Sequence, residues 1–234
     1  MNQEKQKNLD QKLIEAAKNR QVELIKKLIQ EGANIHVWND YPLRFAAYYG
    51  HLDVVKYLVE KGADIHHENN YSLRYASSKG DLEIVKYLVS QGADIHADNN
   101  YALIWAAEGG HLEVVKYLIE KGANIHANNN YALIYASHNG HIDVVKYLVE
   151  KGADIHTNSD DALKTASEKG YLEIVKYFLF DYNMEIKEET KEWLTENKHK
   201  QTLNLIEKRD LLFKLDKDLI QKDFINKLDK KVKL

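Results

Sequence analysis

The chain has 234 residues, of which 44% are hydrophobic and 29% are charged, as in an ordinary folded protein. Its net charge is −3, with lysine and acidic residues intermixed, which argues against the basic face that nucleic acids and membranes require. There is no cysteine, which excludes disulfides and thiolate zinc sites. The polar start MNQEKQKNLDQK is no signal peptide, and no apolar run approaches the roughly 20 residues of a membrane span. These features predict a soluble, intracellular, cytoplasmic protein.

A 30-residue repeat organises the chain. Its clearest marker is a recurring glycine, at Gly32, Gly62, Gly92, Gly122 and Gly152. Such a period is typical of a solenoid of stacked units rather than of one globular core. In chain order, we expect a polar lead-in at 1–10 and an N-terminal capping repeat at 11–40, in which Arg20 and Gln21 replace a Gly-His pair. A more polar first repeat suits a unit with one face in water.

Four regular repeats follow, at 41–70, 71–100, 101–130 and 131–160. Each reads as two short amphipathic helices. In the third copy the apolar residues of the first helix are Leu103, Trp105, Ala106 and Ala107, and those of the second are Leu112, Val114, Val115, Leu118 and Ile119. Gly122 suits a left-handed C-cap with positive φ. An Asn or Asp precedes every first helix, and we expect it to cap free helix N–H groups: Asp40, Asn70, Asn100, Asn130 and Asp160.

The last third of the chain departs from the frame. A divergent repeat spans 161–186, in which six residues rather than five separate Tyr177 from the C-cap position, now Asn183. With that insertion, Leu194 aligns with Leu163, which predicts a degenerate repeat at 187–208. The segment 209–234 carries apolar residues at helical spacing: Leu212, Leu215 and Leu219 on one face, and Ile220, Phe224 and Leu228 on another. We expect one amphipathic helix over roughly 210–231 that caps the open end of the stack, with a loosely attached helix as the alternative.

The repeat resembles the ankyrin repeat. The family signature T-P-L-H-x-A appears as YPLRFA at 41–46, YSLRYA at 71–76, YALIWA at 101–106 and YALIYA at 131–136. The second signature, G-H-x-x-V-V-K-x-L followed by G-A-D, appears in forms such as GHLDVVKYL…GAD. The match covers roughly residues 11–180. The resemblance implies an all-α helix-turn-helix solenoid that binds another protein through its concave groove, without catalysis.

Two departures from the family pattern stand out. The family period is about 33 residues, and the missing residues fall where the family carries a projecting β-hairpin, so we expect a tight turn there. Tyr also replaces the family's Thr, and Pro survives only as Pro42. Truncated, Asn-rich repeats of this kind resemble those of giant viruses of amoebae. That resemblance implies a viral protein in a host cytoplasm, with a host protein as its partner.

Histidine recurs at a spacing that invites a metal hypothesis. One column comprises His36, His66, His96, His126 and His156, and another comprises His51, His111 and His141. Packed helices lie roughly 8–10 Å apart, whereas two nitrogens on one zinc ion must lie within about 4 Å of each other. The columns cannot chelate, so we expect each histidine to hydrogen-bond a neighbouring turn. Metal and cofactor are predicted to be none.

Catalytic motifs are missing from the sequence. It contains no G-x-S-x-G elbow, Walker A loop, H-E-x-x-H or dinucleotide fingerprint. Carboxylates such as Asp53 and Glu113 recur in every repeat, which indicates a scaffold role. We therefore predict no catalytic residues and no enzyme.

Positions that vary between repeats are where a binding surface can be encoded. The candidate partner-binding residues are Trp38, Arg44, Tyr48, Tyr49, Arg74, Lys79, Ile104, Ile134 and His138. Trp, Tyr and Arg dominate many interface energies, so we expect Trp38, Tyr48, Tyr49 and both arginines to be at least partly exposed on one surface. The alternative is that Trp38 covers the capping repeat and the tyrosines pack under the shortened turns.

Two functions remain open. The first is a monomeric, non-catalytic scaffold that binds a protein through the concave face, with neither nucleic acid nor membrane as a partner. The second is a substrate-recruiting adaptor whose C-terminal tail docks a second complex, such as a ubiquitin ligase. A tail fully packed on the repeats would favour the first.

Overall fold

The structure is a computed structural model that describes the backbone of residues 3–232 and the side chains up to residue 217, together with Leu219. Every regular element in this described part is helical, so the predicted all-α class is confirmed. The chain divides into two compact units, Met1–Asp154 and Ile155–Leu234. The predicted apolar face of Ile220, Phe224 and Leu228 lies outside the described side chains.

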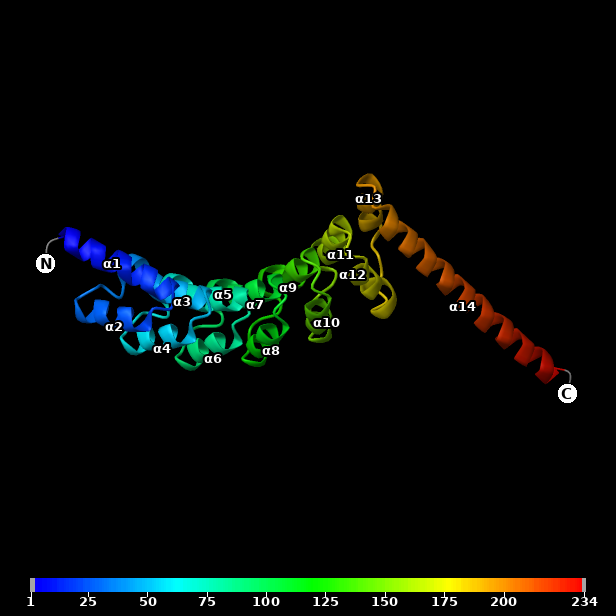
Figure 1. The fold of residues 1–234 in the computed structure, drawn as a ribbon. Coiled ribbons are helices and arrows are strands. Elements are labelled where there is room, and N and C mark those ends of the chain that lie inside the picture. The colour runs from blue at the N-terminus through cyan, green and yellow to red at the C-terminus, as the bar shows by residue number, and fades with distance from the viewer. Residues whose placement is uncertain (1–2, 233–234) are drawn as a thin grey trace. The chain divides into compact units, whose positions relative to one another are not determined.

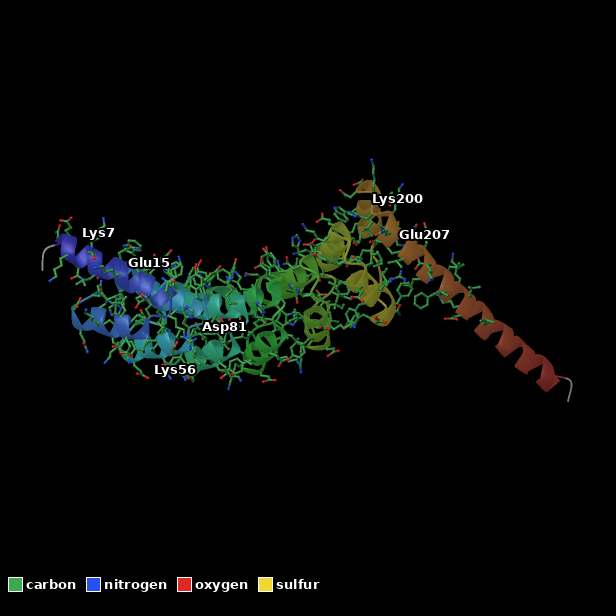
Figure 2. All side chains as sticks on the ribbon, viewed as in Figure 1. Lys7, Glu15, Lys56, Asp81, Lys200 and Glu207 are labelled. Carbon is green, nitrogen blue, oxygen red and sulfur yellow. The ribbon has the colours of Figure 1, made fainter. Side chains whose placement is uncertain are left out.

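The first unit consists of two layers of helices (Figure 1). The first-helix layer comprises α1 (Gln3–Lys18), α3 (Val37–Tyr48), α5 (His67–Lys79), α7 (Ala97–Glu108) and α9 (Ala127–His138). The second-helix layer comprises α2 (Val22–Gln30), α4 (Leu52–Glu60), α6 (Leu82–Ser90), α8 (Leu112–Glu120) and α10 (Ile142–Glu150). Leu43 and Ala46 of α3 and Val55 of α4 are fully buried between the layers. Lys56 belongs to the second-helix layer, and Asp81 lies at a connection between the layers (Figure 2).

The shortened turn takes an unusual form. Three consecutive residues near the start of α3, α5, α7, α9 and α11 (Thr157–Lys169) adopt left-handed φ/ψ; in α5, Glu68, Asn69 and Asn70 have φ values of 47°, 58° and 59°. Left-handed backbone costs most L-residues roughly 1–2 kcal/mol each, and Asn and Asp tolerate it best. The Asn-rich triplets of the sequence, such as Asp98-Asn99-Asn100 and 128–130, therefore fit this conformation. The expected tight turn is confirmed as a single left-handed turn.

The glycine after each second helix has positive φ, as predicted. Gly122 has φ 99° and Gly92 has φ 96°. The added Cβ of an alanine at Gly122 would meet nothing within 4 Å, so the backbone angle alone selects glycine there. Asn183 takes the same role in the divergent repeat with φ 55°.

Helix α1 includes most of the segment that we expected as a polar lead-in at 1–10. It begins at Gln3 and buries Leu9. Asp10 also behaves like the Asn/Asp of later repeats, since its Oδ1 accepts the backbone N–H of Asn34 at 2.7 Å. The side chain of Gln6 donates to the same carboxylate at 2.7 Å and to the Gly32 carbonyl at 3.1 Å. Helix α1 is thus two turns longer than a repeat requires.

The second unit holds α11 (Thr157–Lys169), α12 (Leu172–Lys176), the π-turn η1 (Tyr177–Asp181), α13 (Glu188–Glu196) and α14 (Lys200–Val232). The one-residue insertion seen in the sequence is absorbed by this π-turn, which is how helices accommodate an extra residue. Leu194 of α13 and Ile206 of α14 are buried, as in a repeat. Asp160 is fully buried and accepts a hydrogen bond from Thr190 at 2.7 Å.

The C-terminal helix does not cap the stack in the way expected. It begins at Lys200 rather than near residue 210, and its packing extends to Arg209, whose Nη1 donates to the Met184 carbonyl at 2.6 Å. Beyond that point Leu212 is 46% exposed, and Leu215 and Leu219 are more exposed still. The predicted contact of Leu212 with the degenerate repeat is therefore wrong. A segment that mixes apolar and charged residues at helical spacing can form a helix by its own propensity. The same spacing does not require the apolar side of that helix to pack on another element.

Candidate protein-binding face

The structure divides the candidate residues by burial. Trp38 is 59% exposed and Tyr49 42% exposed, Lys79 is exposed, and Tyr48, Ile134 and His138 are half-buried. Arg44 and Arg74 are 8% and 7% exposed, so their expected exposure is wrong; the candidate Ile104 is 1% exposed. These three occupy the same repeat position, which faces the neighbouring first helix. A position that varies between repeats here fills the space between units rather than facing the solvent.

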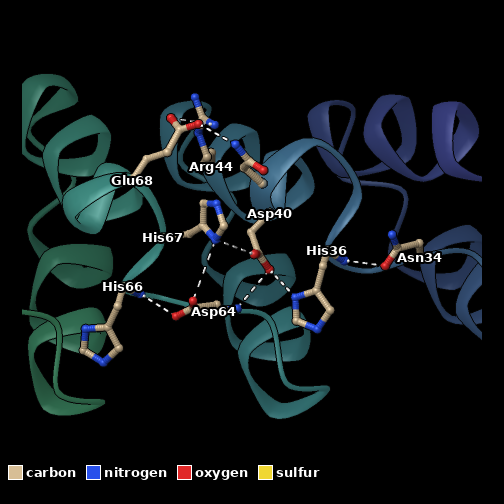
Figure 3. Close-up of polar contacts among 9 residues, drawn as sticks. Asn34, His36, Asp40, Arg44, Asp64, His66, His67 and Glu68 are labelled. Carbon is tan, nitrogen blue, oxygen red and sulfur yellow. Dashed lines mark hydrogen bonds and ion pairs between the residues drawn. The ribbon is translucent and has the colours of Figure 1, made fainter.

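Arg44 lies between the rings of two successive repeats. Its guanidinium carbon is 4.8 Å from the Tyr41 ring centroid and 4.6 Å from that of Tyr71. The guanidinium also pairs with the Glu68 carboxylate at 3.0 Å (Figure 3). The side-chain amide of Asn39 donates a hydrogen bond to Glu68, and with Arg44 nearby it lowers the pKa of that carboxyl group. The positive charge is thus compensated within the turn.

Arg74 repeats the arrangement one unit further on. Its guanidinium carbon is 4.2 Å from the Tyr71 ring centroid, 5.8 Å from that of Tyr101 and 5.1 Å from that of Trp105. It forms an ion pair with Asp98 of the next left-handed turn. Tyr71 therefore has a guanidinium on each side. Guanidinium–ring contacts of this kind are worth about 0.5–2 kcal/mol each, the more so when water is excluded.

Aromatic residues four apart on α3, α5, α7 and α9 form a row, which the sequence interpretation missed. Their side chains are half-buried or exposed, unlike Leu43 or Leu103 on the same helices. We call this row the aromatic face; it comprises Tyr41, Phe45, Tyr71, Tyr75, Tyr101, Trp105, Tyr131 and Tyr135. Because these aromatics recur in every regular repeat, a search for positions that vary between repeats does not select them. The available signal was the replacement of the family's Thr by Tyr, with a second aromatic four residues on.

Ring contacts join the row within and between repeats. Within a helix, the Tyr41 and Phe45 centroids are 4.6 Å apart and those of Tyr71 and Tyr75 are 4.5 Å apart. Between repeats, Trp105 lies 5.7 Å from Tyr71 and 6.0 Å from Tyr75. Edge-to-face contacts at these distances add about 0.5–1.5 kcal/mol beyond area burial. These contacts hold the rings of α5 and α7 against one another.

The variable residues Tyr48 and Tyr49 extend this face at the ends of the helices. The Tyr48 centroid is 5.1 Å from that of Tyr75, and the Lys79 ammonium lies 4.2 Å from the Tyr48 centroid. Tyr49 stacks on Phe45 at 5.8 Å. At the other end of α3, Trp38 lies 5.9 Å from Tyr41, beside a hollow of about 300 Å³ between the left-handed turn and α1. Trp38, Tyr48 and Tyr49 thus adjoin one aromatic surface.

The Asn or Asp that recurs in each repeat forms hydrogen bonds between neighbouring repeats. Asp40, Asn70, Asn100 and Asn130 are buried, and each accepts the backbone N–H of the residue 24 positions on, at 2.8–2.9 Å. The backbone N–H groups that these side chains accept thus belong to the next repeat, whereas we expected N–H groups of the following helix. Figure 3 shows Asp40 between its own repeat and Asp64 of the next. Each bond fixes a left-handed turn against its neighbour.

Both histidine columns form hydrogen bonds, as predicted. The Nε2 atoms of His51, His111 and His141 each lie 2.9 Å from a backbone carbonyl one repeat earlier, those of Lys18, Ser78 and Glu108. In the other column, His36, His96, His126 and His156 contact the Asn or Asp four residues on. Asp81 stands at the His51 position, and burial raises the pKa of its carboxyl group. No cluster that could hold a metal ion occurs in the described part of the chain.

Comparison with known proteins agrees with this geometry. The model of the family described as ankyrin repeats, in three copies, matches residues 13–99, 73–159 and 103–190, which together span well over half of the chain. The chain belongs to the ankyrin-repeat family. Among curated proteins, none matches it. Ankyrin repeats generally mediate protein–protein interactions, and proteins built from them are typically scaffolds rather than enzymes. Among the described helices, none is long and apolar enough to cross a membrane.

Proposed function

We propose that this chain is a non-catalytic scaffold that binds a partner protein through the aromatic face and its extensions Trp38, Tyr48 and Tyr49. The observation that supports this most is a row of half-buried or exposed rings on four successive first helices, of which those on α3, α5 and α7 are joined by ring–ring and arginine–ring contacts. Large aromatic side chains that are already ordered lose little conformational entropy on binding, and Tyr and Trp are enriched among energetic hot spots.

The experiment is affinity capture from a cell lysate with matched variants. Tyr48→Ala together with Tyr49→Ala should reduce capture while the helical circular-dichroism signal is unchanged. The control is Tyr117→Ala together with Tyr147→Ala, which removes two half-buried tyrosines from the second-helix layer. Equal capture by both double variants would contradict the proposal, and unfolding of the first variant would show that Tyr48 and Tyr49 are packing residues.

A second candidate function has its own observation. Among the described side chains of α14, five apolar ones are exposed: Leu211, Leu212, Phe213, Leu215 and Leu219. Exposed apolar residues in one segment favour a contact with another protein. This favours the adaptor hypothesis, in which the tail docks a second complex while the aromatic face recruits a substrate. Capture that survives the tyrosine variants but is lost on removing residues 211–234 would support it.

The cellular setting belongs to the same proposal. The protein is a cytoplasmic monomer of an amoebal giant virus and has a host protein as its partner. This part of the proposal is supported by the resemblance of the truncated, Asn-rich repeats to those of such viruses. Capture of the same partner from amoebal lysate, and a monomer mass in light scattering, would test these points.

A further inference from the structure

The histidines that precede the second helices occupy a site at the end of the preceding first helix. The Nε2 atom of His111 is 2.9 Å from the Ser78 carbonyl, and a Cβ added to Gly80 would overlap the His111 ring. His141 lies in the same way against Gly110. We call this place the ring site; it lies beside the glycine that ends a first helix and the carbonyl two residues before that glycine.

The ring site at the end of α11 has no ring in it. Gly170 ends α11 with φ 74°, close to the 75° of Gly110, yet a Cβ added to Gly170 would meet nothing within 4 Å. A hollow of about 210 Å³ is lined by Ser167 and Leu172, which flank Gly170 in the sequence, and by His199. The space that a histidine fills in earlier repeats is therefore open here.

His199 stands at the backbone position of these histidines in the last repeat. Its N–H donates to the Leu194 carbonyl, five residues earlier, at 2.9 Å, as the N–H of His111 donates to that of Ala106. The residue before it, Lys198, has a left-handed φ of 61°, and α14 begins directly after it. The His199 ring, however, stacks on Trp193 of α13, with the centroids 5.1 Å apart and the planes at 16°.

We propose that His199 exchanges between two positions, the stack on Trp193 and the ring site beside Gly170. In the ring site its Nε2 would lie near the carbonyl of Glu168, which corresponds to Ser78 and Glu108 of the earlier repeats. A ring stack and a hydrogen bond stabilise a protein by similar amounts. Two arrangements of similar free energy are both populated.

The exchange would control how the start of α14 is attached. In the ring site, His199 would link the first turn of α14 to the end of α11, as His111 links the start of α8 to the end of α5. In the stack on Trp193 it contacts α13 instead. One side chain thus attaches or releases the junction between the last repeat and the C-terminal helix. This inference does not depend on the proposed function.

Nuclear Overhauser spectroscopy of the full chain with labelled histidine tests the exchange. In the unaltered protein we expect the His199 ring to show contacts with both the Trp193 ring and the α-protons of Gly170. His111, which is in its ring site, is the internal control and should show its contact with Gly80 throughout. Trp193→Ala removes the stack and should raise the population of the ring beside Gly170 by about two- to tenfold, the effect of one aromatic contact.

A His199 ring that contacts Trp193 alone, or Gly170 alone, in the unaltered protein has a single position and would overturn the inference. A Trp193→Ala variant that keeps the His111 contact but shows no stronger contact between His199 and Gly170 would overturn it as well. Because the first measurement is made on the unaltered protein, it does not depend on how the variant folds.

Discussion

The backbone N–H of Asn124 donates a hydrogen bond of 2.8 Å to the side-chain oxygen of Asn100, 24 residues earlier in the chain. Asn100 is buried and is itself in the left-handed conformation, with φ 64°. Asn100 thus forms part of the left-handed turn of its own repeat and stabilises the turn of the next repeat through a hydrogen bond. The same relationship recurs along the first unit, so the stability of neighbouring repeats is coupled through these amides.

Asn100→Ala should therefore destabilise the solenoid more than Asn99→Ala. Both changes place alanine in a left-handed position, but Asn99 is exposed, whereas Asn100→Ala also removes the part-buried hydrogen bond from the Asn124 N–H. The expected difference in the free energy of unfolding is about 0.5–1.5 kcal/mol. Urea denaturation of the two variants measures it, and equal midpoints would show that the hydrogen bond contributes nothing.

Alanine substitutions at two glycines distinguish the cost of backbone strain from the cost of steric crowding. Gly122→Ala should cost on the order of 1 kcal/mol, because φ is 99° and the space for a Cβ is open. Gly110→Ala should cost more, because its φ is 75° and the new Cβ would lie 2.5 Å from Nδ1 of His141. Thermal unfolding of both variants tests this order, and a larger loss for Gly122→Ala would contradict it.

Asp81→His should stabilise the protein. It would complete the histidine column by placing Nε2 near the Tyr48 carbonyl, 33 residues earlier, as in the bonds of His51, His111 and His141. A hydrogen bond of this kind is worth about 0.5–1.5 kcal/mol. His111→Asp is the reciprocal change and should lose a similar amount. An unaltered unfolding midpoint at neutral pH in both variants would refute the role given to the column.

The pH dependence of Asp81 gives a separate prediction. Burial raises the pKa of Asp81 in the folded protein above its value in the unfolded chain. The folded state therefore holds this proton more tightly, and stability falls as the pH rises from the unfolded pKa through the folded pKa. Asp81→Asn should then be more stable than the original protein at neutral pH, with the difference shrinking below the unfolded pKa of about 3.9. A gain that is independent of pH would mean that charge burial is not its cause.

Removing residues 211–234 should leave the melting temperature unchanged. Packing within the second unit extends to Arg209, and the apolar side chains just beyond it are exposed. Arg209→Ala should lower the melting temperature, because it removes the hydrogen bond to the Met184 carbonyl. Scanning calorimetry of the truncated protein and of the variant tests both, and a lower melting temperature after truncation would show that the exposed part of α14 is stabilising.

The sequence predicted the repeat frame because glycine and Asn residues are constrained by local backbone geometry. Gly122 and Asn183 could be assigned positive φ from their place after a helix alone, and both have it. Arg44, Arg74 and Ile104 could not be placed in the same way. Variation between repeats does not distinguish a residue facing solvent from one filling the gap between units. The aromatic face was missed because it does not vary between repeats. A tyrosine that recurs in every repeat can either pack in the interior or face the solvent.

The C-terminal helix illustrates a different limit. The spacing of Leu212, Leu215 and Leu219 predicts a helix correctly, because helical periodicity is a local property. It does not say what covers that helix, which depends on whether another surface of fitting shape is available. Leu194, by contrast, was placed by alignment to a repeat, and it is buried.

Site-directed photo-crosslinking tests the central claim most directly. A benzophenone amino acid at position 49 or 135 would lie on or beside the aromatic face, and one at position 117 would lie on the second-helix layer. The account predicts that the captured partner crosslinks at positions 49 and 135 and not at position 117. Crosslinks at position 117 alone, or only at positions within 211–219 of α14, would contradict binding through the aromatic face.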